Sequence, residues 1–139
     1  MLFPKKVKHR KWQTARLSQA KLDRPETRGI TVAFGSFGLK ADTSSRVAAN
    51  QIESARRAMT RHAGKTAKIW IRIFPDRPVT QKAAEVPMGK GKGDPDRYVF
   101  EVRPGRILFE VDGVTEAVAR ESLRKAGTKL PLKTHVVAR

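Results

Sequence analysis

Arginine is the residue type with the clearest chemical potential in this chain, and its spacing indicates phosphate binding. Arg56, Arg57 and Arg61 follow one another closely, Arg46 precedes them, and Glu53 is the only acid from 46 to 61. A solvated helix face usually mixes both signs of charge, because Glu–Lys pairs stabilise it. The planar guanidinium group suits bidentate contact with a phosphate. These four arginines therefore predict a phosphate-binding face.

A run of glycine and lysine forms a second candidate site. Residues 88–93 are Met88, Gly89, Lys90, Gly91, Lys92 and Gly93. Glycine lets backbone N–H groups approach a phosphate because it has no Cβ, and lysine adds positive charge. The surrounding stretch, 79–97, has no hydrophobic periodicity, which predicts a long loop. A flexible, solvated loop is the alternative interpretation of the same pattern.

The residue spacings in this chain do not match the known motifs for nucleotide or metal binding. Gly64-Lys65-Thr66 has the ending of a P-loop, but Met59 stands where the first glycine belongs. The alternating glycines of 88–93 do not match the dinucleotide fingerprint. The string at 35–38 fits the GXXG pattern of an RNA-binding KH loop, but between two short β runs it predicts a plain turn. The three histidines and the acids suggest no metal site and no nucleophile with a base, so we expect neither an enzyme nor a cofactor.

Composition points to an anionic partner. The 139 residues hold 30 Lys and Arg against 13 Asp and Glu, a net charge of +17. Such a charge opposes compaction unless a polyanion compensates it. The absence of cysteine excludes disulfide scaffolds and thiolate chemistry. No apolar run approaches the roughly 20 residues of a membrane span, and no secretory signal is evident. We therefore expect a cytoplasmic binder of polyanions with no membrane partner.

The elements expected to position these residues divide the chain into an arm and one domain. Residues 1–28 hold nine Lys and Arg against two acids and lack periodicity, which predicts a basic arm that orders on a partner. Residues 29–139 predict a single α+β domain, with a mostly antiparallel sheet packed against two helices. Strands are expected at 30–34, 67–74, 98–102, 107–111 and 135–138.

The first expected helix starts from caps at 42–45, stops at Gly64 and buries Ala48, Ile52, Ala55 and Met59. The second runs from 114 to 126. Pro104-Gly105 is expected to centre a tight hairpin turn between the strands at 98–102 and 107–111.

Several runs together resemble the family of bacterial large-subunit ribosomal protein sixteen, the counterpart of archaeal and eukaryotic protein ten. They occur in the family's order and cover most of the chain. They are residues 4–11, 50–61, 69–80, 88–93, 103–110 and 129–134. The chain departs from the family pattern at Pro87, where an arginine is usual.

The resemblance implies a non-enzymatic component of the large ribosomal subunit. It implies binding to the large rRNA near the peptidyl-transferase centre and contact with A-site tRNA, with P-site tRNA as the alternative. The implied fold is an α+β sandwich with a β-hammerhead. The implied partners are rRNA, tRNA and other ribosomal proteins, without a homo-oligomer, and an organellar ribosome is left open beside the cytoplasmic one. A free basic RNA- or DNA-binding module is the alternative that composition fits equally well.

The resemblance also assigns residues to the two RNAs. The rRNA-binding residues are Lys5, Lys6, Lys8, Arg10, Lys11, Arg46, Arg56, Arg57 and Arg61. The residues near tRNA are Lys82, Met88, Gly89, Lys90, Gly91, Lys92 and Gly93.

Overall fold

Two antiparallel sheets form the framework of the chain, and the expected α+β class is confirmed. The computed structural model describes residues 1–14 and 18–139. The first sheet has the order β3-β6-β1-β7, with β3 Lys68–Ile71, β6 Ile107–Asp112, β1 Phe37–Ala41 and β7 Thr134–Ala138. The second has the order β2-β5-β4, with β2 Ser45–Ala48, β5 Asp94–Val102 and β4 Arg77–Gln81.

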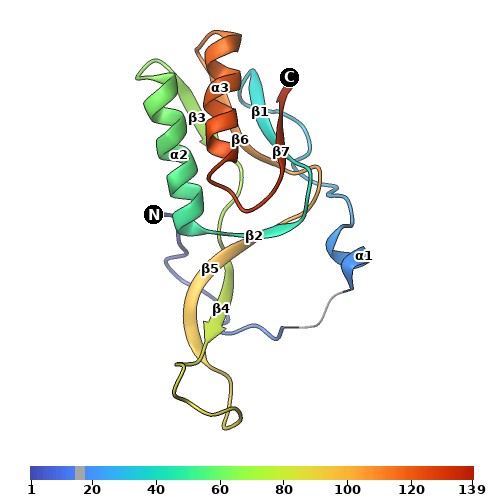
Figure 1. The fold of residues 1–139 in the computed structure, drawn as a ribbon, viewed down its shortest axis with the longest axis vertical. Helices are drawn as coiled ribbons and strands as arrows, with labels where there is room; N and C mark the ends of the chain where they lie inside the picture. The colour runs from blue at the N-terminus through green and yellow to red at the C-terminus, as the bar shows by residue number, and fades with distance from the viewer. Residues whose placement is uncertain (15–17) are drawn as a thin grey trace.

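Two helices, α2 (Ala49–Ala63) and α3 (Glu116–Gly127), lie side by side against the first sheet (Figure 1). The expected core face of α2 is confirmed at Ile52, Ala55 and Met59, all fully buried. Together with Phe109 of β6 and Leu123 of α3 these residues belong to the main hydrophobic core. Gly64 ends α2 at a φ of +80°, as expected, because only glycine adopts this region at little cost.

The expected helix start at 42–45 is wrong. Residues 45–48 instead form β2, because they pair with Val99–Val102 of β5. Ala48 therefore lies in a strand and only precedes α2. The side-chain oxygen of Gln51 accepts a hydrogen bond of 2.9 Å from the Ala48 N–H, which satisfies one free donor at the start of the helix.

The expected strand at 30–34 is also wrong. The backbone N–H groups at the end of this segment bind a side chain and not a neighbouring strand. The backbone N–H groups of Ala33, Phe34 and Gly35 donate to the carboxylate of Glu110 at 3.1, 2.6 and 2.8 Å. Glu110 is fully buried in β6 and forms an ion pair with Arg72. Burial alone would raise the pKa of Glu110, but these donors lower it overall. One carboxylate thus replaces a neighbouring strand and fixes the segment before β1.

Pro104-Gly105 forms a turn, but the expected hairpin is wrong. Gly105 has a φ of +95°, and its N–H donates to the carbonyl of Ala41 at 2.7 Å. The strands on its two sides belong to different sheets, since β5 pairs with β2 and β4 whereas β6 pairs with β1 and β3. The turn therefore passes the chain from one sheet to the other.

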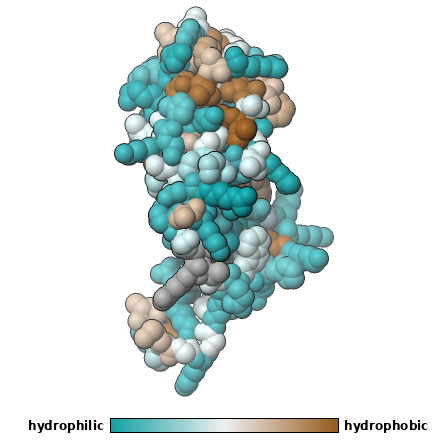
Figure 2. Space-filling view, turned by 90° about the vertical axis from the view of Figure 1, so that its right-hand side faces the viewer, coloured by the Kyte–Doolittle hydropathy of each residue, from teal (hydrophilic) through white to brown (hydrophobic). Residues whose placement is uncertain are grey.

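The hairpin of β4 and β5 extends away from the helices and ends in a loop over 82–93 (Figure 1). This loop is shorter than the expected 79–97, because the strands pair as far as Gln81 and Asp94. In the described part of residues 1–28 the only regular element is the short helix α1 (Gln19–Leu22). Residues 15–17 of the expected arm lie outside the described residues. The face turned to the viewer in Figure 2 is largely hydrophilic, in keeping with the high charge.

Candidate nucleic-acid interface

The exposed face of α2 carries three of the predicted arginines around a single acid. Arg56 holds Glu53 through its Nε and Nη2 atoms at 3.0 and 2.6 Å, and the Arg57 Nε lies 3.1 Å from the same carboxylate. Hydrogen bonds from Arg56 first, and then from Arg57, lower the pKa of Glu53 to about 2. The side chain of Arg57 remains 75% exposed, and Arg61 is exposed one turn further along. The face therefore keeps an excess of positive charge.

Arg46 does not join this face. It lies in β2, where its Nη2 atom is 3.1 Å from Glu101 of the neighbouring strand β5. Arg77 of β4 shares the same carboxylate, with its Nε at 3.2 Å. The predicted set of four arginines is thus divided, because Arg46 belongs to the second sheet and the other three belong to α2.

The basic arm runs from exposed lysines into contact with the β4–β5 hairpin. Lys5, Lys6 and Lys8 are exposed. The next two cations point to one acid of β5, since Lys11 Nζ lies 3.3 Å and Arg10 Nη2 lies 4.0 Å from Asp94. The first three are accordingly more available to an external anion than Arg10 and Lys11 are.

The arm also touches the base of the glycine-lysine loop. Lys11 Nζ donates to the carbonyl of Lys92 at 3.2 Å, and Lys92 Nζ donates to the carbonyl of Trp12. The guanidinium carbon of Arg77 lies 5.4 Å from the centre of the Trp12 ring. We call this group of Lys11, Trp12, Arg77, Lys92 and Asp94 the arm–loop contact. Trp12, Arg77 and Asp94 were not predictable from the sequence, because the contact joins segments that are remote in the sequence.

The tip of the loop has an unusual backbone. Gly89, Lys90 and Gly91 have positive φ angles of 93°, 54° and 95°. For lysine this conformation is uncommon, whereas glycine adopts it readily. Lys82 Nζ donates to the carbonyl of Gly89 from the start of the loop, and Met88 is 99% exposed. The tip therefore presents backbone and the Lys90 side chain outward, while Lys82 and Lys92 hold other parts of the chain.

Gly93 is required for steric reasons at the end of the loop. A Cβ on this residue would lie 2.7 Å from the backbone carbonyl of Gln81 in β4. The glycine therefore allows the two sides of the loop to meet closely where the hairpin begins.

The described residues contain no group of three or more His, Cys, Asp and Glu side chains that could hold a metal ion. His135 lies 2.6 Å from Asp42, a pair that the sequence spacing does not reveal, and both side chains are about half exposed. Among the described helices none is long and apolar enough to cross a membrane.

The sequence of the chain matches the model of a known protein family. A family model described as ribosomal protein L16p/L10e matches residues 4–137, which is nearly the whole chain. The match includes α2, the glycine-lysine loop and all but the first residues of the arm.

Proposed function

Because the chain belongs to the ribosomal protein L16p/L10e family, we propose that it binds large-subunit rRNA through α2 and the N-terminal arm. Membership makes the chain a structural constituent of the large ribosomal subunit that takes part in translation, with rRNA and other ribosomal proteins as partners. The family is one of structural proteins and not of enzymes. The resemblance found in the sequence is thereby confirmed.

The observation that carries the rRNA proposal is the incomplete neutralisation of the α2 face. Glu53 engages Arg56 closely and Arg57 in part, and the Arg57 side chain remains 75% exposed. Arg61 makes no ion pair within the described part of the chain. Arginine in this setting favours phosphate, since its fork can bind two oxygens at once. Lys5, Lys6 and Lys8 of the arm supply further exposed charge.

Salt dependence of rRNA binding tests this proposal. Arg57→Ala with Arg61→Ala should reduce the magnitude of the slope of log K against log salt by roughly 0.7–0.9 per lost phosphate contact. A matched control, Lys65→Ala with Lys133→Ala, removes the same charge from exposed positions outside this face and should change the slope less. Stability should change little in both, because the buried residues of α2 are untouched. Equal slopes for the wild type and the arginine variant would contradict the proposal.

We further propose that the loop contacts A-site tRNA, with P-site tRNA as the alternative. Family resemblance and the geometry of the tip support this role. Positive φ angles at 89–91 turn the backbone outward, and Lys90 adds charge beside it. The tip provides no group that titrates near neutral pH, so its role would be tRNA placement and not chemistry.

Location and stoichiometry complete the proposal. We expect the chain in cytoplasmic ribosomes as a single copy without self-association, and an organellar ribosome stays an alternative. A free basic nucleic-acid-binding module is disfavoured by the near-complete family match. Such a module would not co-sediment with large subunits at high salt.

A further inference from the structure

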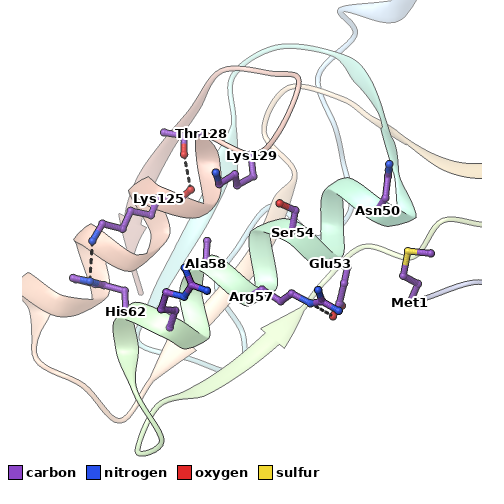
Figure 3. A pocket seen from close by; sticks show the side chains of 11 residues that line it. Met1, Asn50, Glu53, Ser54, Arg57, Ala58, His62, Lys125, Thr128 and Lys129 are labelled. Atoms are coloured by element: carbon purple, nitrogen blue, oxygen red, sulfur yellow. Dashed lines mark hydrogen bonds and ion pairs between the residues drawn. The ribbon is translucent and has the colours of Figure 1, made fainter.

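A groove lies between α2 and α3 and is lined by cations from both helices (Figure 3). Its volume is about 770 Å³. The helix α2 contributes Arg57, Arg61 and His62, and α3 with the turn after it contributes Lys125 and Lys129. Of these groove residues, only Arg57 and Arg61 were predicted from the sequence to bind RNA, because the lysines of α3 join them only when the two helices pack together.

Acids neutralise this groove only in part. Among the described residues that line it, Glu53 is the one carboxylate, and this side chain is paired with Arg56 and Arg57. On α3, Glu121 makes its closest contacts with Arg124, at 2.8 Å, and lies 3.7 Å from Lys125. Lys129, like Arg61, has no ion pair among the residues that the structure describes. The groove therefore keeps net positive charge on both walls.

One contact shows how closely the basic groups approach each other. Lys125 Nζ lies 3.0 Å from Nδ1 of His62, which is within hydrogen-bonding distance (Figure 3). Two basic side chains from different helices thus meet directly, with the Glu121 carboxylate 3.7 Å from the Lys125 nitrogen. An anion bound here would accept hydrogen bonds from groups that otherwise bind each other or water.

The remaining lining indicates which anion fits. Ser54 and Ala58 have short side chains, so a ligand can approach α2 between the longer cations. Of the described lining residues, Met1, at one end, is the only one with a large apolar side chain, whereas protein interfaces usually have an apolar and aromatic centre. Phosphates on a flexible backbone match this arrangement better than an acidic protein surface does.

We propose that the groove between α2 and α3 binds the phosphate backbone of rRNA, with Lys125 and Lys129 as contacts in addition to the α2 arginines. The inference rests on the proposed rRNA function and extends it to a second helix. In this proposal the RNA backbone lies in the groove that α2 and α3 form, and not only across the outer face of α2.

Charge removal from α3 is the first test, made with the full-length protein and large-subunit rRNA. Lys125→Ala with Lys129→Ala should reduce the magnitude of the salt slope by roughly 1.4–1.8, as expected for two phosphate contacts. Arginine at both positions should restore the slope, and Lys65→Ala with Lys133→Ala is the control of equal charge. If folding suffers from the loss of the Lys125 contact, Lys129→Ala alone should still reduce the slope by roughly 0.7–0.9.

If the salt slope of the α3 variant equals that of the control variant, the proposal that the groove binds rRNA is wrong. The proposed function would then stand as long as the α2 arginine variant still reduces the slope. Unchanged slopes in both variants would overturn both proposals.

A crosslinking test separates the groove from the outer face of α2. The chain has no cysteine, so Ser54→Cys and Thr60→Cys each provide a unique site for a short photoreactive thiol reagent. Ser54 lines the groove, whereas Thr60 is exposed on α2 outside it. In reconstituted large subunits we expect rRNA crosslinks from position 54. Crosslinks from position 60 alone, or from position 54 to protein alone, would overturn the inference.

Discussion

At the scale of single residues, one buried carboxylate fixes a segment of the backbone that has no neighbouring strand. Glu110 accepts hydrogen bonds from three consecutive backbone N–H groups and pairs with Arg72. The segment it holds brings Phe34 against Trp70, with ring centres 6.2 Å apart. A buried acid is costly unless all its oxygens are satisfied, and here they are. Glu110 is therefore a structural residue, although it is an acid in a basic protein.

Replacing Glu110 tests this role. Glu110→Gln should reduce the free energy of unfolding by about 3 kcal/mol, because Arg72 loses its charged partner and one backbone N–H faces an amide donor. Urea unfolding followed by tryptophan fluorescence measures the change. The native pKa of Glu110 is lowered, so the carboxylate stabilises the fold above its unfolded pKa of about 4.3.

This contribution is lost as pH falls through the lower, native pKa. The difference between the wild type and Glu110→Gln should therefore be constant from about pH 6 to 8 and shrink in acid below about pH 4. Arg72→Met should reduce the free energy of unfolding less in the Glu110→Gln variant than in the wild type, because the two residues act as a pair. A variant as stable as the wild type at neutral pH would exclude a structural role for the carboxylate.

At the scale of elements, the loop and the arm act together through the arm–loop contact. Lys90 and Lys92 look equivalent in the sequence, but within the described residues only Lys92 donates to the arm, at the carbonyl of Trp12. Lys90 lies at the tip with a φ of 54°. We infer that Lys92 positions the loop and that Lys90 is available to RNA.

Comparison of Lys90→Ala with Lys92→Ala checks this division. Lys92→Ala should speed amide hydrogen exchange over 82–93 in the free protein, because the loop loses a contact to the arm. Lys90→Ala should leave exchange unchanged and weaken aminoacyl-tRNA binding to reconstituted ribosomes. Subunit assembly serves as the control and should be nearly normal in both. Identical exchange in the two variants would show that the arm does not hold the loop.

Elements with their own periodicity were predictable from the sequence, and those defined by remote partners were not. The alternation around Ile69 and Ile71 correctly predicted a strand, although β3 covers only residues 68–71 of the expected 67–74 and these two side chains are partly buried. The helical spacing of Ile52 and Met59 correctly predicted the buried face of α2, although not its start. The strand β2 was missed because its four residues become extended only by pairing with β5. The segment at 30–34 looks like a strand in composition, but a carboxylate takes the place of its neighbour.

The same distinction applies to the site. The arginines of α2 are visible in the sequence because they share one helix. The lysines of α3, and the contact of Trp12 with the loop, require the tertiary fold to bring them together.

At the scale of the whole molecule, a net charge of +17 acts on stability and on binding in opposite ways. Cations on both walls of the α2–α3 groove and along the arm repel one another in the free protein. Salt screens this repulsion over a Debye length of about 10 Å at 0.1 M. The same ions compete with the protein for rRNA phosphates. One change of conditions should therefore stabilise the free chain and weaken its complex.

Raising monovalent salt from about 0.05 to about 0.5 M should increase the Tm of the free protein, since self-repulsion opposes the compact state. Over the same range, affinity for rRNA should fall linearly on a log–log plot. Calorimetry of the free protein and filter binding with rRNA measure the two trends. Lys125→Ala with Lys129→Ala should show a smaller rise in Tm, because it removes repulsion across the groove. A Tm that falls with salt in the wild type would mean that exposed ion pairs such as Arg120–Glu116, which salt screens, outweigh the repulsion. At low salt the ion pairs would then stabilise the fold by more than the excess charge destabilises it.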